Sequence, residues 1–244
     1  MSSVILKKQI LRLVGVLMVV AGLAAAVGEA RAQWPPPDDD QIDLSDPQYW
    51  PNDSYDGRWN YWSWIHPDAY DRVQAYSPYE IALGSGLSAD KAWQKTIGNR
   101  RVVLAVLDSG IKWRTRDLAN KYYLNDGELP PPDAGCTGDG TTYDVNGDLV
   151  FNVQDYTTDT GHPCDTRLLA HPGGWDVNGN GFLDPQDLIA VFSDGVDDDL
   201  NGYVDDISGW DVYNDDNDAA DDTEFGHGTG EAEWSGAEGN NGIG

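Results

Sequence analysis

The sequence predicts an α/β protein with a mostly parallel sheet flanked by helices and interrupted by a long acidic segment. Three observations lead to this prediction. Residues 102–107, VVLAVL, form a continuous run of β-branched and aliphatic residues, which is typical of a strand buried on both faces of a parallel sheet. Residues 89–96, ADKAWQKT, precede the run and favour a short helix. Residues 125–210, called the acidic segment below, are rich in Asp, Asn and Gly and repeat one spacing.

The charge balance of the chain limits its partners. The 244 residues include 15 Lys and Arg against 42 Asp and Glu, and the net charge is −27. Nucleic acids need a basic face, so they are excluded as partners, and an anionic membrane surface is disfavoured. Ten Trp and twelve Tyr argue against a disordered acidic chain. The carboxylates therefore either solvate the surface or hold cations.

The first 32 residues have the pattern of a secretory signal peptide. A basic start at residues 7–12 is followed by an apolar stretch at 13–27 and by an Ala-Arg-Ala cleavage site at 30–32. The apolar stretch is short for a membrane span, although an uncleaved anchor is the alternative. We expect a secreted or periplasmic protein with no stable membrane span after cleavage.

Residues 33–87 follow as an extension that is rich in Pro, Asp and aromatic residues and has no helical or strand period. The sequence leaves open whether this extension is a propeptide. The domain expected to carry the chemistry spans 88–244. In its first helix we expect Ser88 to be the N-cap, Asp90 to lie in the first turn and Gly98 to end the helix.

Asp108 follows the predicted strand directly, and Ser109 and Gly110 turn the chain after it. Ligands and catalytic groups gather outside the carboxyl ends of strands in open α/β sheets. Asp108 is therefore a candidate functional carboxylate, with a cap or turn aspartate as the alternative.

The chain has two cysteines, Cys136 and Cys164. In an oxidising compartment we expect them to form a disulfide, and two free thiols are the alternative.

The clearest metal-binding pattern is DVNGNGFLDPQD, residues 176–187, which has the spacing of an EF-hand or dockerin-like loop. Calcium takes six to eight oxygen ligands, and alternate side chains of a tight loop point inward. Gly181 stands at the sharp turn, and residues 185–192 favour a short exiting helix. Solvated Asx-turns without a metal are the alternative. The expected ligands are Asp176, Asn178, Asn180, the backbone carbonyl of Phe182, Asp184 and Asp187.

Two further loops repeat the pattern, in residues 144–155 and 197–208. In the first, Leu149 replaces the glycine, and a left-handed backbone costs roughly 1–2 kcal/mol at a non-glycine residue. In the other, Ser208 is a weak twelfth residue, so we expect Asp206 to substitute. No entering helix is expected, so the Ca²⁺ ions are predicted to be structural rather than signalling. The ligands expected in the first loop are Asp144, Asn146, Asp148, Asn152 and Asp155. Those expected in the other are Asp197, Asp199, Asn201, the Tyr203 carbonyl, Asp205 and Asp206.

The ordered set VLDSGI at 106–111, an acidic approach from 197, GHGT at 226–229 and GNNGIG at 239–244 resembles the subtilisin-like serine proteases, or subtilases. The resemblance covers about residues 88–120 and 194–244. It implies that Asp108 is the catalytic aspartate and that His227 is the general base. It also implies a subtilisin-like sheet, with the acidic segment as an insertion.

The sequence departs from this family in three respects. Asp108 and His227 are far apart in sequence, Gly230 replaces a second histidine, and Glu231, Glu233 and Trp234 stand on the helix after the histidine. The family's nucleophile serine and oxyanion asparagine lie beyond the motifs present. We therefore expect an N-terminal portion, with a sheet incomplete at its C-terminus and no activity alone.

The resemblance implies a secreted, calcium-dependent serine endopeptidase that acts on protein or peptide substrates through an acyl-enzyme. Two alternatives remain: a non-catalytic secreted calcium-binding or adhesive protein, and a protease-derived pseudoenzyme.

Overall fold

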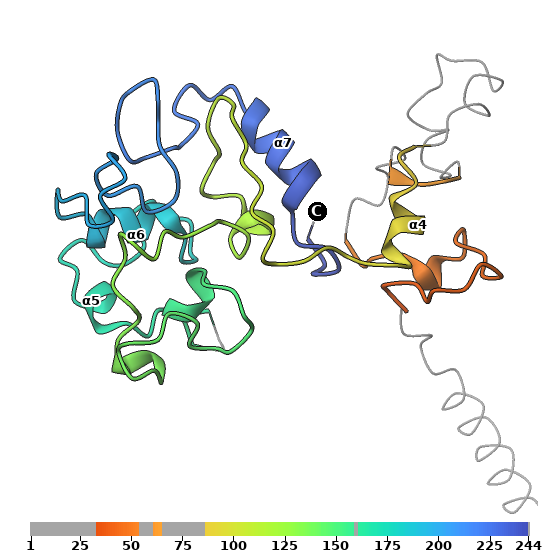
Figure 1. The fold of residues 1–244 in the computed structure, drawn as a ribbon, viewed down its shortest axis with the longest axis horizontal. Helices are drawn as coiled ribbons and strands as arrows, with labels where there is room; N and C mark the ends of the chain where they lie inside the picture. The colour runs from red at the N-terminus through yellow and green to blue at the C-terminus, as the bar shows by residue number, and fades with distance from the viewer. Residues whose placement is uncertain (1–32, 54–60, 65–85, 159–160, 244) are drawn as a thin grey trace, which may run out of the picture. The chain divides into compact units, whose positions relative to one another are not determined.

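The structure is a computed structural model that describes residues 33–53, 61–64, 86–158 and 161–243. The chain divides into two compact units, and the ribbon in Figure 1 is coloured along the chain. The first unit comprises residues 1–51 and 56–95, and the second comprises residues 52–55 and 96–244. The predicted signal peptide, residues 1–32, lies outside the described residues.

The described residues of the first unit include two short helices and a cluster of aromatic rings. They are the 3-10 helix η1, Pro47–Tyr49, and the α-helix α4, Ala89–Trp93. The ring of Trp93 meets that of Trp34 edge-on at 5.9 Å and that of Trp62 at 5.8 Å. Asp90 is buried and accepts hydrogen bonds from the backbone N–H (2.9 Å) and the hydroxyl (2.6 Å) of Ser63. The extension that the sequence describes as irregular therefore includes a packed aromatic cluster.

The start of the predicted first helix is confirmed, with Ser88 at the N-cap and Asp90 in the first turn, but its predicted end is wrong. Ser88 stands at the N-cap, but its backbone is left-handed (φ 61°) and its side chain makes no capping hydrogen bond. The helix ends at Trp93, with Gln94 as its C-cap, and not at Gly98. A helix of five residues has too few internal hydrogen bonds to continue without packing partners.

The predicted α/β fold is also wrong, because the described residues form no β-strand. Their ladder contacts are isolated bridges, such as the parallel bridge between Ile111 and Ala220. Residues 102–107 were predicted to be a buried strand, yet Val103 is 62% exposed and Leu107 is 90% exposed. A parallel strand depends on hydrogen-bonded neighbours and on helices that cover its faces. Among the described residues no segment pairs with this run, so its apolar sequence alone does not make it a strand.

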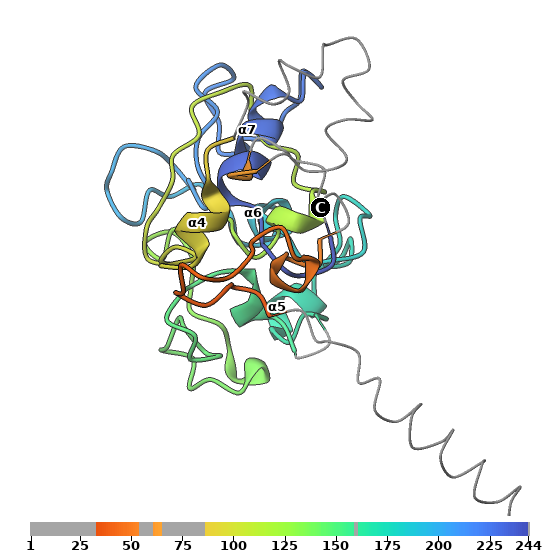
Figure 2. The ribbon, with the colours of Figure 1, turned by 90° about the vertical axis from the view of Figure 1, so that its right-hand side faces the viewer.

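The described residues of the second unit form two apolar cores. The larger core holds together the 3-10 helix η5, Val153–Tyr156, and the α-helices α5, Thr166–Leu169, and α6, Pro185–Phe192. Figure 1 and Figure 2 both show α5 close to α6, as their residue contacts require. The buried residues of this core are Leu124, Leu129, Val153, Tyr156, Leu168, Leu183, Leu188, Ile189 and Ile207.

The smaller core joins the 3-10 helix η3, Arg116–Leu118, to the α-helix α7, His227–Gly236. Its buried members are Trp113, Leu118, Tyr122 and Ala232. In the described ranges, no helix has both the length and the apolar character that a membrane crossing requires.

The predicted helix at 185–192 and the predicted disulfide are confirmed. Helix α6 begins with Pro185 behind the N-cap Asp184, and Asp187 completes a capping box. Cys136, at the end of the 3-10 helix η4, Ala134–Cys136, is bonded to Cys164. The disulfide ties η4 to the chain just before α5.

Candidate active site and calcium loops

Asp108 and His227 are in direct contact in the structure. His227 Nδ1 lies 2.7 Å from Asp108 Oδ2, although the two residues are 119 positions apart. His227 is the first residue of α7, and Gly226 before it has a left-handed backbone (φ 79°). The His227 side chain is 54% exposed and that of Asp108 is 21% exposed. The sequence-predicted pair is therefore assembled, with the imidazole open to solvent.

Two glycines permit this contact. A Cβ atom on Gly228 would lie 2.5 Å from the carbonyl oxygen of Gly110 and 3.0 Å from Asp108 Cβ. Gly110 has a φ of 94°, and a Cβ there would lie 2.5 Å from the carbonyl oxygen of Ala220. Both backbones approach closely because neither residue has a side chain.

Hydrogen bonds between the two segments hold the start of α7 in place. Thr229 Oγ1 accepts the backbone N–H of Lys112 at 2.9 Å, and Ser109 Oγ accepts the N–H of Gly228 at 3.2 Å. Ile111 donates its N–H to the carbonyl of Ala219 at 3.1 Å. The turn after Asp108 is thus fixed to both sides of the histidine.

The electrostatics favour an ionised Asp108. The backbone N–H of Ser109, and less strongly the His227 side chain, hold the pKa of Asp108 below its ordinary value. An ionised carboxylate accepts hydrogen bonds only, so the proton of the contact belongs to His227 Nδ1. In neutral imidazole this tautomer leaves the other ring nitrogen, Nε2, as a proton acceptor.

The surroundings of Nε2 are open. Glu231 Oε1 lies 4.0 Å from it, one turn along α7, and the Phe225 ring stacks on the imidazole at 5.8 Å. The two nearby serines are engaged elsewhere. Ser109 Oγ bonds to Gly228, and the hydroxyl of Ser235 donates to the carbonyl of Glu231 at 2.6 Å. Within the described residues, neither of these two serines is hydrogen-bonded to His227.

The carboxylates on α7 do not enter a core. Glu231 is exposed, Glu233 is half-buried and Trp234 is 44% exposed, whereas Ala232 packs against η3. The helix therefore faces the smaller core with its small residues and faces solvent with its charges, which avoids the cost of a buried carboxylate.

The loop at 176–187 is held by hydrogen bonds between its own carboxylates and its own backbone N–H groups. The first residue, Asp176, accepts the N–H groups of Asn180 (2.9 Å) and Gly181 (3.0 Å), and Gly181 is left-handed (φ 86°). The last residue, Asp187, accepts the N–H of Val177 at 2.7 Å. The side chains of Asn178 and Asn180 both donate to Asp184, which also caps α6. The predicted ligand side chains are thus gathered at the start of α6.

Burial and the neighbouring charge of Asp184 raise the pKa of Asp187 to about 7. Both carboxylates are fully buried. Their closeness concentrates negative charge inside the protein at the end of this loop.

The loop at 144–155 repeats the same arrangement. Asp144 accepts the N–H groups of Asp148 (3.1 Å) and Leu149 (2.9 Å), and Asp155 accepts that of Val145 (2.8 Å). Leu149 occupies the glycine position with a φ of 73°. Asn152 caps η5 and forms a capping box with Asp155. The backbone turn required by the motif is therefore made even without glycine.

The loop at 197–208 begins in the same way and ends differently. Asp197 accepts the N–H groups of Asn201 (3.0 Å) and Gly202 (2.9 Å). Asp205, a predicted ligand, instead accepts the N–H groups of residues 194 and 195, outside the loop. Asp206 faces the loop and accepts the side-chain amide of Asn201 at 3.1 Å.

A carboxylate that the sequence reasoning missed lies beside this loop. Oxygens of Glu128, Asp199 and Asp206 all lie within 4.8 Å of one another. Glu128 lies outside the three repeated loops, so the spacing that predicts their ligands does not predict Glu128. The preceding Asn-Asp-Gly, a turn signal, is the only local indication of its position.

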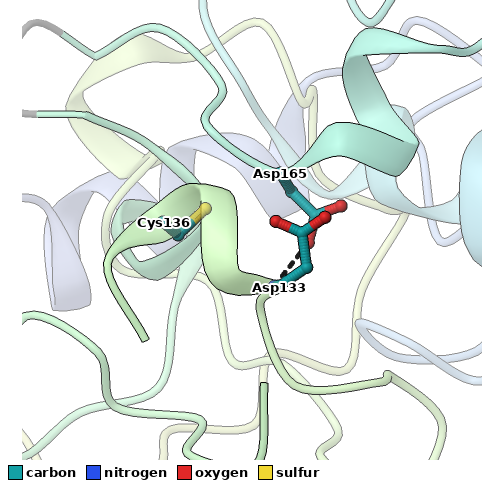
Figure 3. Close-up of side chains that lie close together, drawn as sticks. All are labelled: Asp133, Cys136 and Asp165. Atoms are coloured by element: carbon teal, nitrogen blue, oxygen red, sulfur yellow. Dashed lines mark hydrogen bonds between the residues drawn. The ribbon is translucent and has the colours of Figure 1, made fainter. Parts of the chain in front are cut away.

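A second group, Asp133, Cys136 and Asp165, is shown in Figure 3. Its sulfur belongs to the disulfide and its carboxylates have partners. Asp165 Oδ2 accepts the N–H of Asp133 at 3.0 Å and pairs with Arg167 at 2.6 Å. This group is therefore a capping and ion-pair cluster that ties η4 to α5.

The GNNGIG segment is held by a carboxylate from residues 52–55. Asp53 accepts the backbone N–H groups of Asn240 (2.9 Å) and Asn241 (3.0 Å), and the Asn241 side chain donates to Asp117 at 2.7 Å. The segment thus follows α7 and lies against the end of η3.

Comparison of the chain with protein-family models, with curated proteins and with solved structures finds no match.

Proposed function

We propose that the protein is a hydrolase of the serine endopeptidase type, in which Asp108 and His227 form the orienting carboxylate and the general base. The observation that carries this proposal is the 2.7 Å contact between His227 Nδ1 and Asp108 Oδ2 across 119 residues. The contact joins an exposed histidine to an aspartate that is distant in sequence. It requires glycine at positions 110 and 228, where a side chain would collide with the backbone. This arrangement supports a functional role for the pair.

The chemistry follows from the tautomer. Asp108 holds the Nδ1–H and fixes the ring, so that Nε2 can take the proton of a serine hydroxyl as this hydroxyl attacks a peptide carbonyl. Neither Ser109 nor Ser235 supplies that hydroxyl, because both are bonded elsewhere. The imidazolium that forms is stabilised by the ionised Asp108. It then returns the proton to the leaving amine, which leaves an acyl-enzyme that water hydrolyses. The exposed side of the ring gives a peptide substrate room to approach.

The test is proteolysis by protein expressed from the complete reading frame. We expect cleavage of casein, and Asp108→Asn should lower kcat by about 10⁴-fold and His227→Ala by about 10⁶-fold, as is typical of such triads. His171→Ala is the matched control, because His171 Nδ1 bonds only locally, to the carbonyl of Gly174 at 2.9 Å.

Full activity in His227→Ala would refute the proposed base. Absence of hydrolysis in the unmodified protein would favour the non-catalytic calcium-binding alternative.

We also propose that the loops at 144–155 and 176–187 bind Ca²⁺. The supporting observation is that both loops direct their first and last carboxylates at their own backbone N–H groups in the same manner. Two loops of different sequence thus adopt one turn that gathers oxygen side chains, which are the ligands that calcium prefers. When bound, calcium would neutralise carboxylates such as Asp187 and stiffen the acidic segment.

We propose export from the cytoplasm as well. The signal-peptide pattern of residues 1–32 and the Cys136–Cys164 disulfide support an oxidising compartment.

A further inference from the structure

The side chain of Glu128 has one oxygen without a partner. Glu128 is only 5% exposed, and its Oε1 accepts the backbone N–H of Asp199 at 3.1 Å. Its Oε2 is shielded from solvent and accepts no hydrogen bond from the described residues. A buried carboxylate oxygen is costly unless it is hydrogen-bonded or neutralised by a cation. The position therefore calls for a partner that these residues do not supply.

The neighbours of Glu128 increase this cost. Carboxylate oxygens of Asp199 and Asp206 lie within 4.8 Å of a Glu128 oxygen and of each other. Amide groups from Asn125 and Asn201 donate to both aspartates, at distances of 2.8–3.1 Å. In the described part of the chain, no Lys or Arg forms a salt bridge with any of the three carboxylates. Three negative groups thus converge with only neutral donors between them.

The local structure brings Glu128 to the loop. The N–H groups of Glu128 (3.2 Å) and Leu129 (3.1 Å) both bond to the carbonyl of Asn125, and the N–H of Asn125 bonds to the carbonyl of Ile207 at 2.9 Å. A Cβ atom on Gly127 would lie 2.6 Å from Asp199 Cβ. The turn at 125–129 is therefore fixed against the end of the loop, and glycine allows the close approach.

The loop at 197–208 lacks the carboxylate that normally closes a calcium site. The twelfth residue of such loops supplies two oxygens from one carboxylate. Here it is Ser208, whose hydroxyl donates to the carbonyl of Tyr123 at 2.7 Å. Asp205 is bonded to backbone groups outside the loop. The loop therefore has no carboxylate at its twelfth position, and the carboxylate of Glu128 lies beside Asp199 and Asp206 of the same loop.

We propose that Glu128 is a calcium ligand contributed from outside the loop, and that it completes a site with Asp199, Asp206 and the loop side chains of Asp197 and Asn201. The three carboxylates and the loop oxygens provide the hard, oxygen-only ligand set that calcium takes. This site joins residues about seventy positions apart and therefore locks the start of the acidic segment to its end. The assignment rests on the calcium binding proposed above.

The test is calorimetric titration of EDTA-stripped protein with CaCl₂ at constant ionic strength. Glu128→Gln should lose one Ca²⁺ per chain or weaken one site by about tenfold or more, because carboxylate charge sets affinity in such loops. Glu224→Gln, at an exposed glutamate, is the matched control and should bind as the unmodified protein does. Asp176→Asn should remove a different Ca²⁺, so that the losses of the two variants add.

Thermal melting separates this role from a purely structural one. Glutamine keeps the acceptor for the Asp199 N–H and removes a buried charge, so in EDTA the variant should melt no lower than the unmodified protein. Its midpoint should rise less on adding CaCl₂. Unchanged Ca²⁺ stoichiometry and affinity in Glu128→Gln would overturn the assignment of Glu128. If the unmodified protein binds no Ca²⁺ at all, the broader calcium proposal fails instead.

Discussion

Gly228 is the residue on which the Asp–His contact depends most directly. It stands next to His227, and its missing side chain leaves room for the carbonyl of Gly110 and for Asp108 Cβ. Conformational freedom is not the reason for glycine here, because the residue is helical. The reason is the close approach of two backbones.

The Gly228→Ala variant should therefore lose stability and the Asp–His contact together. Its new methyl would meet atoms at 2.5 and 3.0 Å, and overpacking of this kind costs about 1–3 kcal/mol. Urea unfolding measures this loss. The His227 ring signals in NMR report the contact, and they should shift towards those of a free histidine.

Gly230→Ala is the matched control on the same helix. A Cβ atom there meets nothing within 4 Å, and alanine favours a helix over glycine by about 1 kcal/mol. This variant should be as stable as the unmodified protein or more stable. Equal behaviour of the two variants would contradict the close-approach argument.

At the scale of elements, a capping signal within a few residues predicts a helix correctly, whereas an apolar run alone does not predict a strand. Helix α6 is predicted correctly because Asp184, Pro185 and Asp187 encode its start within four residues. The run at 102–107 is apolar enough for a buried strand, but a strand exists only through partners that its own sequence does not specify. Motif resemblance predicts the roles of Asp108 and His227, whereas no sequence pattern indicates Glu128, because only three-dimensional proximity links it to the loop at 197–208.

The loop at 144–155 offers a test at this scale. Leu149 is 66% exposed and has a φ of 73°, so its side chain contributes little packing and its backbone is strained. Leu149→Gly should leave stability unchanged or raise it by up to about 1 kcal/mol, since relief of the left-handed strain offsets the flexibility of glycine.

Leu169→Gly is the comparison for this change. Leu169 is also exposed, at 56%, but it lies in α5. Leu169 is the last residue of α5, and glycine there should cost up to about 1 kcal/mol in the free energy of unfolding. Chemical denaturation in EDTA compares the two variants. A larger loss in Leu149→Gly than in Leu169→Gly would show that the turn at position 149 is not strained.

At the scale of the whole molecule, the net charge of −27 opposes compactness. Bound cations would relieve this repulsion where it is greatest, in the acidic segment. Calcium should therefore raise the thermal midpoint of the protein. At 100 times the dissociation constant, each site adds about 2.7 kcal/mol, and each kcal/mol corresponds to about 2–4 °C in a chain of this size.

Differential scanning calorimetry in EDTA and in CaCl₂ measures this shift, with NaCl at matched ionic strength as the control for simple screening. An equal rise in NaCl would show that screening, and not site binding, stabilises the acidic segment.

The hydrogen bond from Asn125 to Ile207 has a further consequence, for the order in which the chain closes. It joins the two ends of a long stretch, so that only residues 112–124 and 208–219 then separate the bridged positions Ile111 and Ala220. The entropy lost on closing a loop grows with its length. Once Asn125 and Ile207 are bonded, the residues between them no longer add to the loop that must close. The entropy lost when Asp108 meets His227 is therefore smaller than their separation of 119 positions would suggest.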